Sequence, residues 1–376
     1  MRVAVVGAGV VGCAVARELA ADHEVCVLDR AGVGEGTTAR SAGKVTMTPA
    51  YPDRPAVAAH ATAFFERRAA YVPRESVELV PPDREGEARR RVDRLADEGL
   101  DVRFLDADAT AATYPRLALG EHCGVVRHEG TGYLDAAALT DALAAEARER
   151  GARFRTDTAV REFDVESGAV RGVLTDEGRV PADAVVVAAG WRTPDLVDDH
   201  LTLPVRPYRT QCVRYRLDAP ARGFPQGGVP EAGVYFRPAD AGERLLVGGW
   251  AEPVADPAGA SRDCDAAFRD HARGVVPSLL DPGSGAIEAG WAGVDCGTPD
   301  ARPVVDAPAE GPDGLVVATG FHGRGVMTAP VAATAVRSLL ADEPAPFSTD
   351  AFALSRFADR SPDFDFLEIG RDTGRE

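Results

Sequence analysis

Lysine is almost absent from this 376-residue chain, in which Lys44 is the only one. Arginine therefore carries nearly all of the 42 basic charges, against 59 acidic residues and a formal net charge of −17 at pH 7. So large an acidic excess repels phosphate backbones and anionic lipids alike. We therefore expect neither a nucleic-acid partner nor attachment to an anionic membrane surface.

The same imbalance is similar to that of proteins from a high-salt cytoplasm. Molar salt screens the repulsion between carboxylates that otherwise opposes compaction. The composition thus favours an acidic, halophilic protein whose melting temperature rises with salt.

Paired cysteines and long hydrophobic runs are also missing. The apolar start, from Val3 to Leu19, is interrupted by three glycines and closed by Arg17 and Glu18, unlike a signal peptide, and no stretch is long enough to span a bilayer. The six cysteines are scattered, with no C-x-x-C pair and no histidine cluster at metal-ligand spacing. These absences predict a soluble, cytoplasmic protein with reduced thiols and no metal site.

The 45% of hydrophobic residues suffice for one large core or two moderate ones. A strand at Met1–Val6, a glycine turn, a helix at Cys13–Ala21 and a strand at Glu24–Leu28 predict a βαβ unit. Apolar runs at 184–189 and 314–319 are typical of buried parallel strands.

Other segments predict the remaining elements. Residues 134–150 predict a helix with Asp135 as N-cap and Gly151 as its stop. Alternating patterns predict a hairpin or meander at 154–173 and an antiparallel sheet at 205–250, while 56–116 and 330–340 predict helices.

The turn Gly7–Gly12 reads G-A-G-V-V-G, which matches G-x-G-x-x-G between a strand and a helix, with Asp29 at the end of the next strand. The first glycine makes the turn, the second lets the backbone approach a pyrophosphate, and the third lets the helix pack on the strand. A pyrophosphate would lie at the positive helix N-terminus, and Asp29 would accept hydrogen bonds from a ribose. A strand–helix turn without a ligand is the alternative, and the motif alone does not separate FAD from NAD.

Other segments favour FAD. The loop 36–43 (G-T-T-A-R-S-A-G) resembles the second FAD-contacting loop of the FAD-dependent amine and amino-acid oxidoreductases of the D-amino-acid oxidase, glycine oxidase and sarcosine oxidase type. Residues 184–191 resemble that family's strand beside the adenosine, and 314–330 resemble its C-terminal strand, glycine turn and helix. Segments 131–135 and 235–238 also occur along the chain in the same order as the corresponding segments of that family. The resemblance covers nearly the whole chain except about 50–120.

The resemblance implies non-covalent FAD and an α/β, glutathione-reductase-like fold. A Rossmann-like FAD-binding domain would comprise 1–85, 130–203 and 297–376, with an inserted antiparallel-sheet substrate domain at 204–296 and a helical segment at 86–129. The residues implied in FAD binding are Gly7, Gly9, Val10, Val11, Gly12, Asp29, Arg30, Thr37, Thr38, Arg40, Ser41, Ala42, Gly43, Lys44, Val160, Ala189, Gly190, Trp191, Gly320, His322, Gly323, Arg324, Gly325, Val326 and Met327.

Two cations bear on flavin chemistry. Flavin reduction builds negative charge on the flavin. The turn 320–325 at the start of the last helix would stabilise that charge through the helix dipole and its N–H groups. The alternative is an ordinary glycine-rich turn without this role. Arg324 stands where many relatives carry histidine and would favour reduced flavin further. Lys44 either touches the flavin edge or faces solvent.

For the substrate, the resemblance implies roles for Tyr235, Arg237, Asp295 and Arg324. Tyr235 falls on the family tyrosine that helps hold the substrate carboxylate, although it equally fits a buried sheet tyrosine. Asp295 stands where glycine-oxidase-like members carry the carboxylate-binding arginine, so it either binds a cationic amine or caps a turn. A substrate carboxylate would then need Arg237, Arg302 or Arg324.

Two further departures concern sarcosine-oxidase-like members. Met327 replaces their substrate lysine, and Gly293 replaces the cysteine that tethers their FAD. Cys296 is out of register for such a tether, which is why non-covalent FAD is expected.

Together these features predict an FAD-dependent oxidoreductase that oxidises the C–N bond of a small amine or amino acid by hydride transfer to flavin N5. Oxygen or another acceptor would then take the electrons. Two alternatives stay open, namely an FAD-dependent 2-hydroxy-acid dehydrogenase and the flavin subunit of a multi-subunit enzyme. The sequence carries no signal for the oligomeric state.

Overall fold

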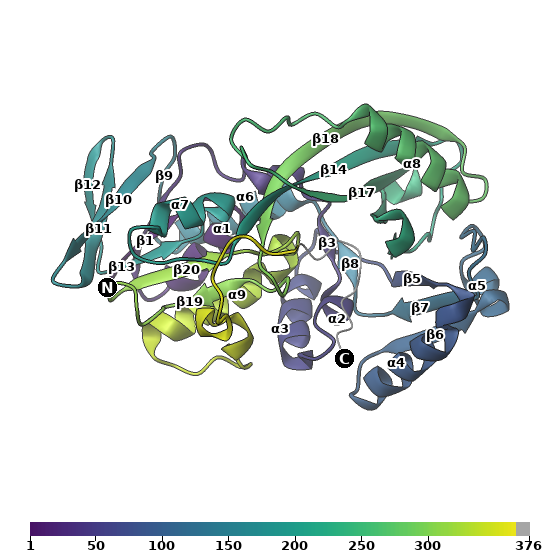
Figure 1. The fold of residues 1–376 in the computed structure, drawn as a ribbon, viewed down its shortest axis with the longest axis horizontal. Helices are drawn as coiled ribbons and strands as arrows, with labels where there is room; N and C mark the ends of the chain where they lie inside the picture. Colours follow the sequence, from purple (N-terminus) through teal and green to yellow (C-terminus); the bar gives the residue numbers. More distant parts are fainter. Residues whose placement is uncertain (366–376) are drawn as a thin grey trace.

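The structure, a computed structural model, describes residues 1–365. One half of the molecule, with strands from both ends of the chain, is built on a six-stranded sheet in the order β19-β20-β13-β1-β2-β9, parallel except for β19 (Figure 1). The strands are β1 (Arg2–Val6), β2 (Glu24–Leu28), β9 (Arg153–Arg155), β13 (Ala184–Val187), β19 (Val304–Asp306) and β20 (Leu315–Thr319).

Both faces of this sheet are covered. Val3 and Val5 of β1 face a core shared with helices α1, α6 and α9, whereas Ala4 and Val6 face a second core on the other side. That side carries the antiparallel sheet β10-β11-β12. The alternation explains why such strands read as continuous apolar runs. The elements are α1 (Val10–Leu19), α6 (Ala136–Glu149), α9 (Gly325–Ala341), β10 (Val160–Glu166), β11 (Ala169–Thr175) and β12 (Gly178–Pro181).

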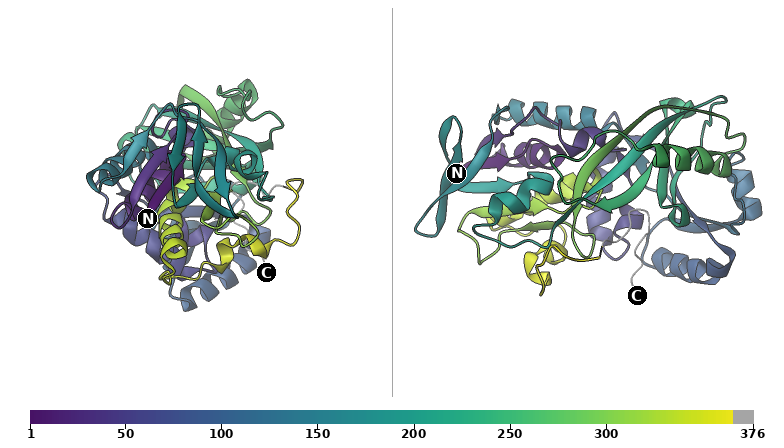
Figure 2. Two further views of the ribbon diagram at one scale, coloured as in Figure 1. Left: turned by 90° about the vertical axis from the view of Figure 1, so that its left-hand side faces the viewer. Right: turned by 45° about the horizontal axis from the view of Figure 1, so that its top comes forward.

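The other half of the molecule is built on an eight-stranded sheet in the order β18-β14-β17-β16-β15-β5-β7-β6, in which every pair is antiparallel except β15 with β5. Helix α8 packs on the long strands and α4 on the end formed by β6 (Figure 2). The elements are β5 (Ser76–Val80), α4 (Glu85–Asp97), β6 (Val102–Asp106), β7 (Gly124–His128), β14 (Arg206–Leu217), β15 (Gln226–Val229), β16 (Val234–Ala239), β17 (Arg244–Pro253), α8 (Ala266–Leu279) and β18 (Gly285–Gly297).

A small sheet lies between the two halves, with β8 between β3 and β4. No helix within residues 1–365 is long and apolar enough to cross a membrane. The remaining elements are β3 (Lys44–Val45), α2 (Met47–Ala50), α3 (Pro55–Glu66), β4 (Val72–Pro73), α5 (Ala107–Thr113), β8 (Gly132–Tyr133) and α7 (Thr193–Val197).

The α/β fold class and the βαβ start are confirmed. Asp135 caps α6 by accepting hydrogen bonds from the amides of Ala137 and Ala138, and Gly151 after the helix has a φ of +99°. Helix α9 begins at Gly325, five residues before the expected start, because the chain turns into the helix directly after the glycine turn.

The description of 86–129 as a helical segment is wrong. It contains α4 and α5, but also β6 and β7, which join the large sheet. These strands are short and lie between charged helical segments, so the alternation of apolar and polar residues is weak in their sequence. β7 forms as a strand because it pairs with β5 on one side and with β6 on the other. The predicted domain limits stay a prediction.

Candidate active site

The glycine turn after β1 is shaped by two close backbone approaches. Gly7 has a φ of +108°, and a Cβ atom there would lie 2.4 Å from the carbonyl oxygen of Ala188, after β13. A Cβ atom at Gly12 would lie 1.9 Å from the carbonyl oxygen of Gly7. Only glycine fits both positions, which lets α1 pack tightly on the sheet.

The N-terminus of α1 presents free amides. Val10 donates to Thr38 Oγ1 at 3.2 Å, whereas the amides of Gly9, Val11 and Gly12 have no acceptor within residues 1–365. A Cβ atom at Gly9 would meet only Thr38 Oγ1, at 3.3 Å. Unpaired amides at a helix N-terminus suit a pyrophosphate, so this cradle fits a dinucleotide.

Asp29 closes the same turn. Its carboxylate accepts hydrogen bonds from the amides of Ala8 at 2.6 Å and Ala31 at 2.8 Å, and its burial raises its pKa. A carboxylate has lone pairs beyond these two bonds, so Asp29 can also accept from a ribose hydroxyl. Arg30 beside it is exposed.

The segment after β13 opens at the same edge of the sheet. Gly190 has a φ of +61°, and a Cβ atom there would meet nothing within 4 Å. Ala189 and Trp191 are half-buried beside it, and Val160 is buried in the core below this edge. Parallel sheets bind dinucleotides at the carboxyl ends of their strands, where the predicted adenosine residues lie.

The loop 36–43 is attached to the large sheet. Thr37 Oγ1 donates to Val294 O at 2.5 Å, and Trp291 Nε1 donates to Arg40 O at 2.9 Å, both reaching strand β18. Ser41 Oγ accepts from the amide of Gly43 at 3.1 Å. The predicted FAD loop is thus held between the two halves of the molecule.

Arg237 lies behind this loop. Its Nε donates to Ala42 O, its Nη1 donates to Pro238 O at 2.9 Å, and the guanidinium lies 4.6 Å from the ring centroid of Tyr133. It is buried and does not line the cavity described next. The structure therefore places Arg237 as a support of the loop, at a position that does not match the predicted contact with substrate.

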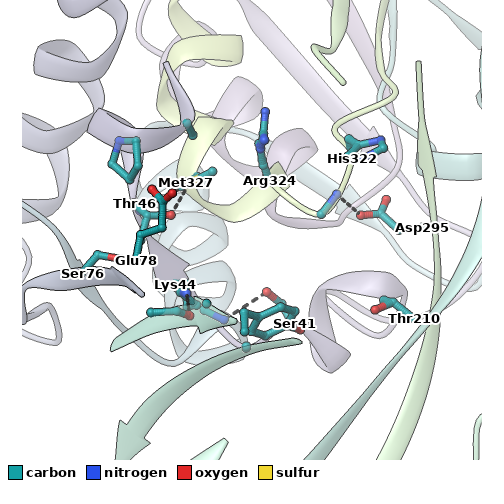
Figure 3. A pocket seen from close by; sticks show the side chains of 18 of the residues that line it. Ser41, Lys44, Thr46, Ser76, Glu78, Thr210, Asp295, His322, Arg324 and Met327 are labelled. Carbon is teal, nitrogen blue, oxygen red and sulfur yellow. Dashed lines mark hydrogen bonds between the residues drawn. The ribbon is translucent and has the colours of Figure 1, made fainter. Parts of the chain in front are cut away.

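A cavity that is open to solvent lies where the two halves meet (Figure 3). Its walls come from the loop 37–44, the turn 322–324 and strands β5, β7, β14, β15, β16 and β18. The predicted residues that line it are Thr37, Arg40, Ser41, Ala42, Gly43, Lys44, Tyr235, Asp295, His322, Gly323, Arg324 and Met327.

Asp295 links β18 to the turn before α9. Its carboxylate accepts hydrogen bonds from the amides of Cys296 at 2.8 Å and Gly323 at 2.9 Å, and lies 3.5 Å from the hydroxyl of Tyr208. Burial raises its pKa. The side chain thus holds the turn and also lines the cavity, so its contact with a substrate amine stays a prediction.

The turn itself has three left-handed residues, of which Gly323 has a φ of +75°. Gly320 has a φ of +73°, and His322, a buried residue whose amide donates to Cys296 O at 2.9 Å, has a φ of +51°. Helix α9 follows with Gly325, Val326 and Met327 in its first turn and no side-chain cap. Its positive end therefore begins at the cavity wall, and its stabilisation of negative charge there stays a prediction.

The cations near the cavity differ in position. Arg324 lines it, with Nη1 3.3 Å from Ala301 O, whereas Arg302 lies outside and pairs with Asp53 at 2.7 Å. Lys44 lines the cavity, donates to Gly227 O at 2.7 Å and lies 5.5 Å from the ring centroid of Tyr235.

Met327 fills the neighbouring wall. Its sulfur accepts from the amide of Thr46 at 3.4 Å and lies 3.7 Å from the hydroxyl of Thr46. The thioether therefore has a local structural partner at the position of the family's lysine.

Sequence reasoning missed the part of the wall formed by β5 and β7. Ser76, Glu78 and His128 line the cavity there. Polar residues at alternate positions of a short apolar segment were the only signal for Ser76 and Glu78.

Comparison with known proteins agrees with this geometry. Residues 2–339 match the family described as FAD dependent oxidoreductase. A D-amino acid dehydrogenase of Rhizobium rhizogenes is 30% identical over 271 residues, 71% of this chain and 63% of that protein. The chain thus spans less than two thirds of that relative's length.

A glycine oxidase of Geobacillus kaustophilus is 29% identical over 374 residues, 94% of this chain and 96% of that protein. Its crystal structure superposes with a TM-score of 0.84 at 25% identity, covering 95% of this chain and all of that one. An L-proline dehydrogenase from P. horikoshii shares the fold, with a TM-score of 0.83 at 22% identity over 94% of this chain and 97% of that chain. The cradle at α1, the loop 36–43 and the turn before α9 fit FAD, and the chain belongs to the FAD-dependent oxidoreductase family.

Proposed function

We propose that this protein oxidises the C–N bond of a small amino acid. The observation that carries the proposal is one cavity lined together by the FAD loop, the turn before α9 and Tyr235 of the large sheet. FAD, when bound, supplies the acceptor for the hydride that leaves the substrate α-carbon. The glycine oxidase and D-amino acid dehydrogenase relatives support an amino acid as the substrate.

Tyr235 and Lys44 are assigned to the substrate carboxylate. Burial raises the pKa of Tyr235, so its phenol stays protonated and is a hydrogen-bond donor at neutral pH. The Lys44 ammonium group carries three donors and is held above the Tyr235 ring by its bond to Gly227 O. Charge-assisted bonds from an ammonium group to a carboxylate would take over the role of the family arginine that Asp295 replaces.

Asp295 is assigned a positioning role. Its bonds to Cys296 and Gly323 fix the turn that leads into α9, and so fix where the positive end of that helix lies. A carboxylate at this place also repels a second carboxylate, which favours substrates that place their amine, and not their acid group, on this side of the cavity.

The test is anaerobic reduction of the holoprotein's flavin absorbance by amino acids, amines and 2-hydroxy acids. Bleaching by amino acids supports the proposal, whereas bleaching by 2-hydroxy acids alone would select a hydroxy-acid dehydrogenase. No bleaching by any of them would point to a flavin subunit that works within a larger enzyme. Repeating active reactions with oxygen or with an artificial dye identifies the class of acceptor.

Variants at Lys44 test the carboxylate assignment. Lys44→Met should raise KM for an amino acid by about tenfold or more, because one charge-assisted hydrogen bond is lost, and should change KM much less for the matching amine without a carboxylate. Lys44→Arg, which keeps the charge, should restore much of the difference. Equal effects on both substrates would contradict the assignment.

A further inference from the structure

The end of the cavity formed by β5 and β7 is polar, although it continues an apolar sheet face. Ser76 and Glu78 alternate with Val77, which packs in the core on the opposite face. His128 of β7 is paired directly with Ser76, and Gly228 of β15 is paired with Glu78. Three polar side chains therefore share one face, beside Gly228, which also lines the cavity.

These groups are arranged as hydrogen-bond acceptors. Glu78 Oε2 accepts from Arg91 Nη2 of α4 at 2.6 Å, whereas Oε1 has no partner within residues 1–365. His128 is only 3% exposed, its Nδ1 has no hydrogen-bond partner in the same residues, and burial lowers its pKa to about 3. The imidazole is therefore neutral at physiological pH and offers one acceptor nitrogen.

A purely apolar ligand would bury Glu78 Oε1 without a partner. Buried polar groups are almost always hydrogen-bonded, and an unpaired one is costly, so a group that donates hydrogen bonds is the complementary occupant. Lys44 lies nearby. Its ammonium group donates to Gly227 O, next to the residue paired with Glu78, so the cavity carries a cation and a carboxylate close together (Figure 3).

We propose that Ser76, Glu78 and His128 form a side-chain subsite for amino acids with a positively charged, hydrogen-bond-donating side chain, such as lysine, ornithine or arginine. The inference rests on the proposed function, since it assumes that an amino acid is oxidised in this cavity. A net charge of −17 also raises the local concentration of cationic substrates. Glu78 would accept from the substrate side-chain cation through Oε1, and Lys44 would hold the carboxylate.

The experiment measures kcat/KM of the purified holoprotein for lysine, ornithine, arginine, glutamate and the uncharged norleucine, each as both enantiomers. In the active enantiomeric series, we expect the best of the three basic amino acids to exceed norleucine by about tenfold or more, as one charge-assisted hydrogen bond allows. Glu78→Gln should lower this ratio by about as much and raise the relative rate with glutamate, because Arg91 is then left without its carboxylate partner. Glu87→Gln, an exposed residue of the same region, is the matched control and should leave the ratio unchanged.

The outcomes separate the two proposals. If no amino acid reduces the flavin, the proposed function itself is wrong. If norleucine is oxidised as well as the basic amino acids, or Glu78→Gln leaves the ratio unchanged, the subsite is wrong while the proposed function stands. A preference of the unmodified protein for glutamate would also overturn the subsite. If Glu78→Gln does not fold, two other measurements test the subsite. The unmodified protein should still prefer basic amino acids to norleucine, and His128→Leu should lower that ratio of kcat/KM values.

Discussion

Replacing Gly12 by alanine tests the structural basis of the dinucleotide cradle. The added Cβ atom would lie 1.9 Å from the carbonyl oxygen of Gly7, well inside van der Waals contact, and both groups belong to the backbone. Overpacking of this kind costs about 1–3 kcal/mol, and the gain for alanine over glycine in a helix is about 1 kcal/mol. We expect a net loss near the upper end, about 2 kcal/mol, because helix α1 itself must move away from β1.

Gly9→Ala is the matched comparison in the same turn. Gly9 has a φ of −71°, which any residue adopts, and its Cβ atom would meet only Thr38 Oγ1 at 3.3 Å. The apoprotein should therefore keep its stability to within about 0.5 kcal/mol, as most substitutions without a named structural cost do. FAD affinity should still fall by about tenfold or more, because the methyl group obstructs the backbone approach to the pyrophosphate.

The assays are urea unfolding of each apoprotein and titration with FAD followed by flavin fluorescence. Gly12→Ala should unfold at lower urea and bind FAD weakly, since the amides of α1 move with the helix. An apoprotein of Gly12→Ala as stable as the unmodified one would refute the packing argument. Undiminished FAD binding by Gly9→Ala would refute the assignment of the cradle to the pyrophosphate.

Three further predictions concern charges. Asp295→Asn should lower the melting temperature by a few degrees and weaken FAD binding, because the amide of Gly323 loses its charged acceptor at a cost of about 1–2 kcal/mol. Asp199→Asn, at an exposed site, is the control in thermal scans. The hydrogen bond from Arg2 lowers the pKa of Asp183 to about 2, so its contribution to stability is present above the unfolded pKa of about 3.9 and is lost as pH falls through about 2. Asp183→Asn should therefore slightly flatten acid unfolding followed by circular dichroism between those values, and an unchanged curve would contradict the pairing. Melting temperature should rise steeply from low to molar KCl, whereas a flat response would exclude a halophilic adaptation.

The FAD half of the fold could be predicted because its signals are local. The motif Gly7–Gly12, the acid at Asp29 and the cap at Asp135 each act within a few residues, and the strands at 184–187 and 315–319 are apolar on both faces. Such patterns predict the same local structure independently of the rest of the chain. The sequence for this reason predicted the residues of the cradle and of the FAD loop.

The substrate side of the cavity was not predictable in the same way. β5 and β15 are about 150 residues apart in the chain, and only their pairing places Glu78 beside Gly228. His128 is brought beside Ser76 by a second pairing, that of β5 with β7. Arg237 shows the converse case, since its place in a family motif suggested a contact with substrate, whereas side-chain packing directs it to Ala42 O.

By itself, the sequence determined that this protein has a dinucleotide cradle, because glycine at positions 7 and 12 and a helix directly after a strand leave little conformational choice. It also determined the charge balance and the place of its single lysine. The tertiary structure decided which polar groups share the cavity with that lysine. Strand register and long-range pairing set those distances, and a shift of one residue would turn Ser76 and Glu78 to the opposite face of the sheet.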